Sequence, residues 1–495
     1  MSDQQKSLKQ IMDFRVEKLS KIKDNGINPY PSKFHPKQFS LEILSDYNSW
    51  EGKDVIIAGR IMAIRKMGKV SFAQIMDSKG KIQIFLSKDG IGDEPYTNFK
   101  LLDIGDFIGI EGKVFKTKTG EISIKTSSLT ILAKSIRPLP VVKEKDGEVF
   151  DSFLDKEQRY RNRHLDLILN PDVKSTFQKR SKIIQSIREF LDNQEFLEVE
   201  TPILQPIYGG ANARPFTTHH NALDQKLFLR IADELYLKRL IMGGFDRVYE
   251  IAKDFRNEGI DRNHNPEFTM LEFYCAYFDY EDCMDIVEDL IRHAAEKIDA
   301  VKVDWGDYKI DLSKKFKRRT FLGLIYEVTG HDLKNFEEDR IRSICVENNI
   351  EIDPSANLGQ ILDQLMSELV EPKLIEPTFV IDYPKLISPL AKSHRSGEQD
   401  IVERFELFIG SAEFANSFTE LNDPIDQRKR LEEQARLKDL GDEEAQPIDE
   451  NFIQAMESGM PPTGGVGLGI DRLTMMLTGN RWIKDVILFP TLRSQ

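Results

Sequence analysis

The sequence predicts an α+β protein in which a small β-barrel precedes a larger domain built from a sheet and helices. A length of 495 residues is enough for two to four domains, and 40% hydrophobic with 31% charged residues is typical of globular proteins. Short alternating segments fill the stretch from residue 55 to 125, whereas long helical periods and strand-like runs follow it. The two patterns indicate two domains of different architecture.

A helix is predicted at the start of the chain, over residues 3 to 25. Its apolar residues recur at intervals of three and four, its other face is rich in lysine, and Gly26 and Pro29 follow its end. The apolar positions are Leu8, Ile11, Met12, Val16, Leu19 and Ile22. We assign residues 1–50 to this helix and to the lead-in to the barrel.

The barrel is predicted from five short β-type runs separated by Gly, Asp and Lys. The runs are VIIAGRIMAIR, VSFAQIMD, KIQIFLS, DFIGIEGKVFK and EISIK, and NFKLL after the third is a possible helical connection. Five short strands in so short a stretch fit a barrel of the OB type. We assign residues 51–136 to it.

A linker and a second domain are expected after the barrel. The linker, residues 137–171, begins with RPLPVVKEKDGE, and RYRNRHLDLILNP is expected to be helical until Pro171. The second domain, residues 172–495, opens with a helical period from 173 to 191 and the strand-like FLEVETPIL. A helix-rich insertion is expected at about 300–375.

Charge is divided unevenly along the chain. The net charge is -13, but residues 1–125 carry about +5 and the rest about -18. A basic first quarter on an acidic body suggests that the first part binds a polyanion. Surface charge without any partner would give the same asymmetry.

Cysteine usage and hydropathy argue against metal clusters and membrane insertion. The three cysteines, Cys275, Cys283 and Cys345, form no CxxC pair and no zinc-ligand spacing, so we expect reduced core thiols. No stretch approaches eighteen consecutive apolar residues, and the N-terminus is charged throughout. We therefore expect a cytoplasmic protein with neither a membrane span nor a secretory signal.

The common phosphate-binding loops are absent from the sequence, but a glycine-rich segment stands near its end. Neither GxxxxGK[ST] nor GxGxxG occurs. In TGGVGLGIDRLTMML, Gly465, Gly467 and Gly469 alternate before an apolar helical pattern, and Arg472 is expected in the first turn of that helix. Such glycines let a ligand lie against a strand, although they also serve as ordinary packing devices.

A long polar hairpin is the most unusual segment. RVYEIAKDFRNEGIDRNHNPEFTMLEFYCAYFDY has alternating flanks and a polar middle. Arg256 and Glu258 are predicted to point the same way on the first strand, and Glu272 and Tyr274 on the second. Arginine is a poor core residue but a good fork for carboxylate or phosphate. A solvated face is the alternative interpretation.

These segments resemble the three ordered motifs of class II aminoacyl-tRNA synthetases. FLEVETPIL, with Pro202, is similar to motif 1 (near 195–204), FRNEG with HNPEFTMLEFY to motif 2 (near 247–280), and GLGIDR to motif 3 (near 464–478). Longer strings resemble the lysyl-tRNA synthetases of that class: YGGANARPFTTHHNALDQKLFLRIADELYLKRLIMGGFDRVYEI, DYPKLISPLAKSHR and RFELFIGSAEFANSFTELNDP. The resemblance covers nearly the whole chain.

The resemblance implies a fold, a reaction and partners. A catalytic domain on an antiparallel sheet of six or seven strands, flanked by helices, would follow an anticodon-binding OB barrel. The implied reaction activates L-lysine with Mg-ATP to lysyl-adenylate and pyrophosphate, and then transfers lysine to the 3′ end of tRNA(Lys). The implied assembly is a homodimer, because motif 1 builds a symmetric interface in this class.

The resemblance also implies which residues handle ATP. Arg256 would hold the α-phosphate and the substrate carboxylate, and Arg472 the γ-phosphate, where negative charge accumulates. Phe268 would stack on adenine. The full implied ATP set is Arg256, Glu258, His264, Asn265, Phe268, Glu406, Gly469 and Arg472. Glu406 and Glu413 would bind Mg²⁺, which prefers carboxylate and phosphate oxygens.

A lysine pocket should offer carboxylates to its cationic substrate, whereas an aspartate pocket should offer arginine or lysine. The implied lysine-binding set is Gly210, Glu234, Arg256, Glu272, Tyr274, Asn416, Phe418 and Glu420. Gly210 and Glu234 would face the α-amino group, and Glu272, Tyr274 and Glu420 the ε-ammonium. The alternative is that these glutamates form internal salt bridges with residues such as Arg230 or Lys238.

In the barrel, the resemblance implies anticodon contacts from Phe72, Gln83 and Arg60, with the ring stacking on a splayed base. Two other functions remain open. A related enzyme for aspartate or asparagine would need a different pocket charge, and a catalytically silent RNA-binding relative would not need Arg256 and Arg472. Asn212 and Lys253 depart from the usual pattern of the family.

Overall fold

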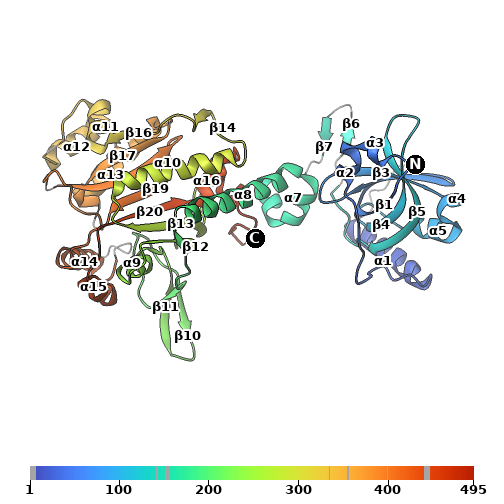
Figure 1. Ribbon diagram of the computed structural model, residues 1–495, viewed down its shortest axis with the longest axis horizontal. Helices are drawn as coiled ribbons and strands as arrows, with labels where there is room; N and C mark the ends of the chain where they lie inside the picture. The colour runs from blue at the N-terminus through green and yellow to red at the C-terminus, as the bar shows by residue number, and fades with distance from the viewer. Residues whose placement is uncertain are drawn as a thin grey trace. The chain divides into compact units, whose positions relative to one another are not determined.

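The computed structural model describes residues 7–140, 143–145, 148–150, 153, 155–333, 335–353, 356–388, 390–398, 400–439 and 446–494. The chain divides into two units, Met1–Leu154 and Asp155–Gln495. Figure 1 shows a β-barrel in the first and a large sheet with covering helices in the second. In the described part of the chain, no helix combines the length and the apolar character needed to cross a membrane.

The first unit contains the closed five-stranded barrel that the sequence predicted, with strand order β1-β2-β3-β5-β4. The strands are β1 (Asp54–Met67), β2 (Val70–Met76), β3 (Lys81–Ser87), β4 (Phe107–Lys116) and β5 (Ile122–Ala133). Alternate residues are buried in β2, in β3 and in the first half of β1, so every second side chain there fills the interior. The short helices are α2 (Ser40–Ser45), α3 (Tyr47–Trp50), α4 (Lys88–Ile91) and α5 (Asp93–Lys100).

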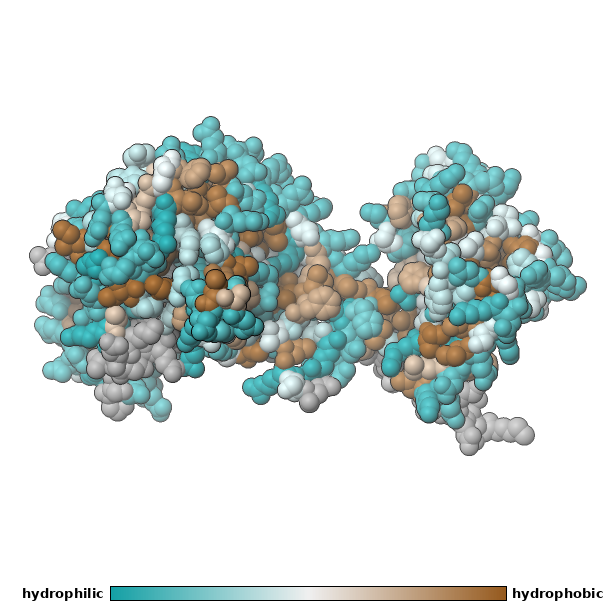
Figure 2. All heavy atoms as spheres, turned by 90° about the horizontal axis from the view of Figure 1, so that it is seen from below, coloured by the Kyte–Doolittle hydropathy of each residue, from teal (hydrophilic) through white to brown (hydrophobic). Residues whose placement is uncertain are grey.

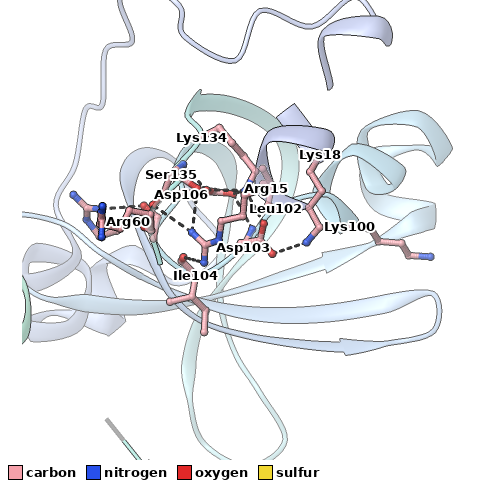
Figure 3. A network of polar contacts seen from close by, with 12 residues as sticks. Arg15, Lys18, Arg60, Lys100, Leu102, Asp103, Ile104, Asp106, Lys134 and Ser135 are labelled. Atoms are coloured by element: carbon pink, nitrogen blue, oxygen red, sulfur yellow. Dashed lines mark hydrogen bonds and ion pairs between the residues drawn. The ribbon is translucent and has the colours of Figure 1, made fainter. Parts of the chain in front are cut away.

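The N-terminal helix α1 (Leu8–Asp24) starts at a capping box formed by Ser7 and Gln10. Its contact with the barrel is more polar than the apolar pattern suggests, because Leu8 and Val16 stay exposed while Arg15 is buried. Arg15 donates from Nη1 to the carbonyl of Ser135 (3.0 Å) and from Nη2 to that of Ile104 (3.0 Å). Charge and hydrogen bonds (Figure 3) therefore hold α1 on the barrel together with Ile22, which is buried in the barrel core.

A buried ion-pair network lies beside this contact (Figure 3). The Nζ of Lys134, whose side chain is fully buried, is 2.7 Å from Asp103 Oδ2 and 2.9 Å from Asp106 Oδ2. Asp103 also pairs with Lys18 of α1 at 2.5 Å, and Asp106 accepts the Ser135 amide at 2.7 Å. Each charge in the network has a partner, as burial requires.

The second unit is built on an eight-stranded sheet of order β16-β17-β18-β19-β20-β13-β12-β8. The six strands from β17 to β12 are antiparallel, as the sequence resemblance implied, but β16 and β8 add a parallel pair at each edge. The sheet is therefore mixed and larger than expected. Its strands are β8 (Leu197–Glu198), β12 (Arg247–Phe255), β13 (Glu267–Ala276), β16 (Lys317–Thr320), β17 (Thr378–Pro384), β18 (Ile401–Ile409), β19 (Ala412–Thr419) and β20 (Thr463–Gly469).

Smaller strands and helices complete both units. The strands are β6 (Lys143–Lys145), β7 (Glu148–Phe150), β9 (Leu204–Gln205), β10 (Thr217–His220), β11 (Gln225–Leu229), β14 (Lys302–Trp305) and β15 (Tyr308–Asp311). The helices are α6 (Lys156–Arg161), α7 (Arg163–Leu169), α8 (Pro171–Asn193), α9 (Glu234–Met242), α10 (Tyr280–Glu296), α11 (Phe321–Thr329), α12 (Glu338–Glu347), α13 (Leu358–Leu369), η1 (Glu371–Lys373), η2 (Lys385–Ile387), α14 (Pro424–Asp439), α15 (Glu450–Glu457), α16 (Ile470–Leu477) and α17 (Ile483–Val486).

The predicted linker contains more structure than a linker needs. Its described residues form the β6–β7 hairpin and the helices α6 and α7, and the next helix begins at Pro171, where proline suits the first helical turn. The buried guanidinium of Arg163 donates to the carbonyls of Lys484, Ile487 and Leu488. These bonds fix the last part of the chain against the start of the second unit.

The alternation of β12 and β13 decides which face of the sheet is core. Tyr249, Leu271, Phe273 and Cys275 pack with α8, α10 and α16 in the main hydrophobic cluster. The intervening side chains point to the opposite face, where the charged residues of the hairpin gather. The expected insertion forms a second cluster from α11, α12 and α13 against the strands near β17.

Most of the surface seen in Figure 2 is hydrophilic, with hydrophobic residues in several separate patches. Three large apolar side chains lie close together in sequence around the segment predicted as motif 1. Leu197, Ile203 and Leu204 are between 43% and 47% exposed. An apolar segment of this kind is a candidate contact surface.

We expect Lys134→Met to destabilise the barrel, because it leaves Asp106 buried without its cation. Breaking a buried pair costs about 3 kcal/mol or more. Hydrogen–deuterium exchange should show lost protection in barrel peptides but not in β12 or β13. Lys113→Met is the matched control, because Lys113 is exposed and 3.9 Å from Asp54. Equal protection in both variants would contradict this account of the network.

Candidate functional site

One cavity of about 390 Å³ opens on the face of the large sheet opposite α8 and α10. Its walls come from the β12–β13 hairpin, from β19 and β20, from the start of α9 and from the segment around Gly210. The sequence-predicted residues that line it are Gly210, Glu234, Arg256, Glu258, His264, Asn265, Phe268, Glu272, Tyr274, Glu413, Asn416, Phe418, Gly469 and Arg472. Glu406 and Glu420 lie outside the lining.

Arg256 occupies the cavity wall just past the end of β12. The sequence placed it on the strand, but β12 ends at Phe255, so Arg256 and Glu258 belong to the loop. The Arg256 amide donates to the carbonyl of Pro266 (2.9 Å), and its guanidinium lies 5.1 Å from the centre of the Phe268 ring. The backbone and an aromatic ring thus position a cation at the cavity.

A second cation, Arg472, faces the loop from the other side. It stands in the first turn of α16, as expected, and donates from Nη1 to the carbonyl of Glu413 at 2.7 Å. Its Nη2 lies 3.2 Å from His264 Nε2, and the other ring nitrogen of His264 is 2.8 Å from Asp261. The two arginines give the cavity two fixed positive groups suited to a polyphosphate.

Asn265 shapes the loop rather than presenting its side chain freely. Its Nδ2 donates to the carbonyl of Glu267 (2.6 Å), and its Oδ1 accepts the Thr491 amide (3.2 Å). The side chain is therefore bonded to backbone on both sides. The same contact ties the end of the chain to the loop that carries His264.

The predicted magnesium ligands form an acidic group beside Arg472. Glu413 Oε2 is 3.3 Å from Arg472, whereas the largely buried Glu406, with 16% of its side chain exposed, pairs with Arg404 and accepts the hydroxyl of Tyr383 at 2.8 Å. Burial raises the pKa of Glu406 to about 7, with a contribution from Glu413. A divalent cation would relieve this repulsion, so the carboxylate donors fit Mg²⁺.

Glu234 and Glu272 line the acidic end of the cavity, and Glu420 and Lys238 lie next to them outside its lining. Tyr274 donates its hydroxyl to Glu272 Oε2 at 3.0 Å, and the two side chains share one face of β13, as predicted. Lys238 Nζ is 2.5 Å from Glu234 Oε1 and also forms an ion pair with Glu420. The internal pairing that the sequence left open therefore exists for Lys238.

Burial controls the protonation of these acids. Desolvation raises the pKa of Glu272 to about 8, with Asp254 and Glu234 adding to the shift. Desolvation also raises the pKa of Glu420 to about 8, because it outweighs the nearby Lys238 ammonium. The ligand-free cavity thus holds protons near neutral pH that a bound cation would displace.

A pair of buried aspartates beneath the cavity was missed by the sequence analysis. Asp233, Asp254 and Glu272 have carboxylate oxygens within 4.8 Å of one another, and Arg230 lies 3.0 Å from Asp233 and 2.8 Å from Glu250. Desolvation and the adjacent Asp254 raise the pKa of Asp233 to about 11. Asp254 lies four residues after Glu250, which is two periods of the strand, and this shared face is the signal that could have revealed it.

Gly465 makes room for the acidic end. A Cβ there would lie 2.2 Å from Glu420 Oε1 and 2.4 Å from the Tyr274 ring, so no other residue fits without moving them. A Cβ at Gly469, in contrast, would meet its nearest atoms at 3.8 Å. The alternating glycines therefore have different roles, and Gly465 permits the close approach of a carboxylate to the strand.

The barrel residues singled out from the sequence share its outer surface. Phe72 on β2 and Gln83 on β3 are half-buried on the outward side of adjacent strands, and the Gln83 amide donates to Ser123 Oγ at 2.8 Å. Arg60 donates to the carbonyl of Gly105 (3.0 Å) and stacks over the Phe107 ring at 4.2 Å. Its guanidinium therefore has a fixed position.

Comparison with known proteins gives family matches for both units. The family model described as tRNA synthetases class II (D, K and N) matches residues 155–493, and the model of the OB-fold nucleic acid binding domain matches residues 55–132. The chain is also similar to a lysine--tRNA ligase of Porphyromonas gingivalis. The two are 48% identical over 492 residues, which cover 97% of this chain and 85% of that protein.

Gly465→Ala should lower the thermal stability of the second unit, because the added methyl group overlaps Glu420 and Tyr274. Overpacking of this kind costs about 1–3 kcal/mol. Differential scanning calorimetry measures the change in Tm. Gly469→Ala is the control and should be nearly neutral. An unchanged Tm in the Gly465 variant would show that the acidic end is not tightly packed.

Proposed function

Because this chain belongs to the class II tRNA synthetases of the D, K and N group, and is therefore an aminoacyl-tRNA synthetase with an OB-fold domain, we propose that the amino acid it joins to tRNA is lysine. The observation that carries the proposal is the buried acidic end of the cavity. Glu234, Glu272 and Glu420 stand where an aspartate-specific pocket would need arginine or lysine.

The two ends of the cavity match the two ends of the substrate. Arg256 would hold the carboxylate of lysine and the α-phosphate of ATP, while the glutamates hold the two ammonium groups. Gly210 and Glu234 lie next to each other and would bind the α-amino group. Glu272, Tyr274 and Glu420 would surround the ε-ammonium.

The reaction needs no protein nucleophile. The lysine carboxylate attacks the α-phosphorus of ATP, pyrophosphate leaves, and the terminal ribose hydroxyl of tRNA(Lys) then takes the lysyl group. Arg256 and Arg472 contribute by fixing the phosphates and offsetting the charge that develops on them. Mg²⁺ held by Glu406 and Glu413 would supply further neutralisation of the triphosphate.

The barrel would bind the anticodon and the second unit would pair with its own copy. Phe72 would stack on a base, with Gln83 and Arg60 beside it.

The exposed Leu197, Ile203 and Leu204 support a symmetric homodimer. In such a dimer the same apolar segment of each subunit would be removed from water by contact with the other copy. We place the activity in the cytoplasm.

Amino-acid-dependent exchange between ATP and pyrophosphate tests the proposal. The full chain should catalyse this exchange with lysine but not with aspartate or asparagine, and it should aminoacylate tRNA(Lys). Exchange with aspartate or asparagine would assign the chain to another member of the group. A complete lack of exchange with every amino acid would favour a catalytically silent RNA-binding protein.

Arg256→Ala should slow lysine-dependent exchange, because the variant lacks the donor that faces the reacting carboxylate and phosphate. The expected loss is at least about 2–3 kcal/mol, or roughly 30- to 150-fold. Arg318→Ala, which removes a partly exposed arginine paired with Asp285, is the control. Wild-type exchange by the Arg256 variant would contradict its role.

The KM for lysine should fall as the pH rises from about 6 to about 8.5, because the ammonium groups require ionised carboxylates. Burial raises the pKa of Glu272 and of Glu420 to about 8 in the ligand-free protein. These groups stabilise the free fold at low pH and lose that contribution as the pH passes their pKa. Exchange kinetics measure the trend, with the KM for ATP as reference. A lysine KM that rises with pH would contradict it.

A further inference from the structure

Lys238 is a fully buried ammonium without a role in the implied catalytic or binding set. It lies one helical turn after Glu234 in α9, and 1% of its side chain is exposed. Its Nζ contacts Glu234 Oε1 at 2.5 Å and forms an ion pair with Glu420, whose side chain is fully buried. Among the residues that the structure describes, Glu420 has no other ion-pair partner.

We propose that Lys238 is a specificity-determining residue, because its ammonium holds Glu234 and Glu420 in place and sets the net charge of the acidic pocket. The proposal rests on lysine being the substrate. Once bound lysine has displaced their protons, the three ionised glutamates carry a formal charge of about -3, and Lys238 reduces it to about -2. That charge matches the two ammonium groups of lysine, whereas the substrate carboxylate faces Arg256 at the other end.

The ion pairs of Lys238 connect two parts of the pocket that are far apart in the sequence. Glu234 begins α9 beside Gly210, and Glu420 follows β19 beside Gly465. A Cβ on Gly210 would lie 2.9 Å from Glu234 Cβ, and one on Gly465 would lie 2.2 Å from Glu420 Oε1, so each glutamate approaches the backbone at a position where only glycine leaves space. Lys238 forms an ion pair with both glutamates and so links the two positions.

The charged and titratable groups around this ammonium are few. Glu234 lies on its own helix, and Glu420 follows the end of β19. On β13, Tyr274 interacts with both glutamates and Glu272 interacts with Glu234. Without Lys238, Glu234 and Glu420 would lose the cation that they share in a dry site, so the proton that burial already favours on Glu420 near neutral pH would be held more tightly. Lysine could then bind only after that proton leaves.

The test compares Lys238→Met with the wild-type chain in lysine-dependent exchange between pH 6 and 9. We expect the lysine KM at pH 7 to rise at least about tenfold and the midpoint of its pH dependence to move up by about one unit. The KM for ATP should stay within about twofold, because the phosphate end is unchanged. Lys134→Met is the matched control, since it removes a buried lysine paired with two aspartates in the barrel.

Lys238→Arg keeps the cation but enlarges its head group. The arginine variant should raise the lysine KM and leave the midpoint of its pH dependence at the wild-type value. This measurement decides the question if the methionine variant does not fold. The inference is overturned if Lys238→Met keeps the wild-type lysine KM and midpoint, if its ATP KM rises equally, or if the arginine variant shifts the midpoint. A wild-type chain without lysine-dependent exchange would instead overturn the proposed function itself.

Discussion

The removal of several carboxyl groups from water beneath one cavity is the constraint on which the second unit depends. Asp233, Glu234, Asp254, Glu272 and Glu420 are each at most 5% exposed. An unpaired carboxylate in such a place is strongly unfavourable, so the surrounding residues must supply cations, hydrogen bonds or protons. Arg230 forms an ion pair with Asp233, and Lys238 forms one with Glu420. Where cations do not suffice, burial raises the pKa of a carboxyl group so that it keeps a proton, as at Asp233.

Strand alternation separates this charged layer from the apolar core. The same two strands present Tyr249, Leu271 and Phe273 to α8 and α10 and present Glu250, Asp254 and Glu272 to the opposite face, where the cavity lies. A shift of one residue in the register would exchange the two sets. The core and the site are thus determined together by the pairing of Glu250 with Glu272.

Local patterns predicted the elements well, and they predicted contacts between distant elements poorly. The barrel, α1, α8 and the shared face of Glu272 and Tyr274 follow from periods of two or 3.6 residues. The parallel edge strands β8 and β16 could not be predicted, because each has only a few residues and depends on its neighbour. The residue types of the site were recognised through motif resemblance, while periodicity alone would have left Glu406 and Glu413 among ordinary surface acids. The pairing of Lys238 with the glutamates was left open as an alternative, because a Glu and a Lys four apart on a helix usually form an exposed pair and only the fold shows that this pair is buried.

The attachment of the chain's last residues has a practical consequence for handling the protein. Arg163 holds the carbonyls of Lys484, Ile487 and Leu488, and the Thr491 amide bonds to Asn265 in the loop that also carries His264. A tag or fluorophore fused after this segment would be coupled to the loop of the cavity wall that carries Asn265 and His264. Immobilisation through α1, which belongs to the other unit, leaves that loop undisturbed, whereas a probe at the C-terminal end would report changes in it.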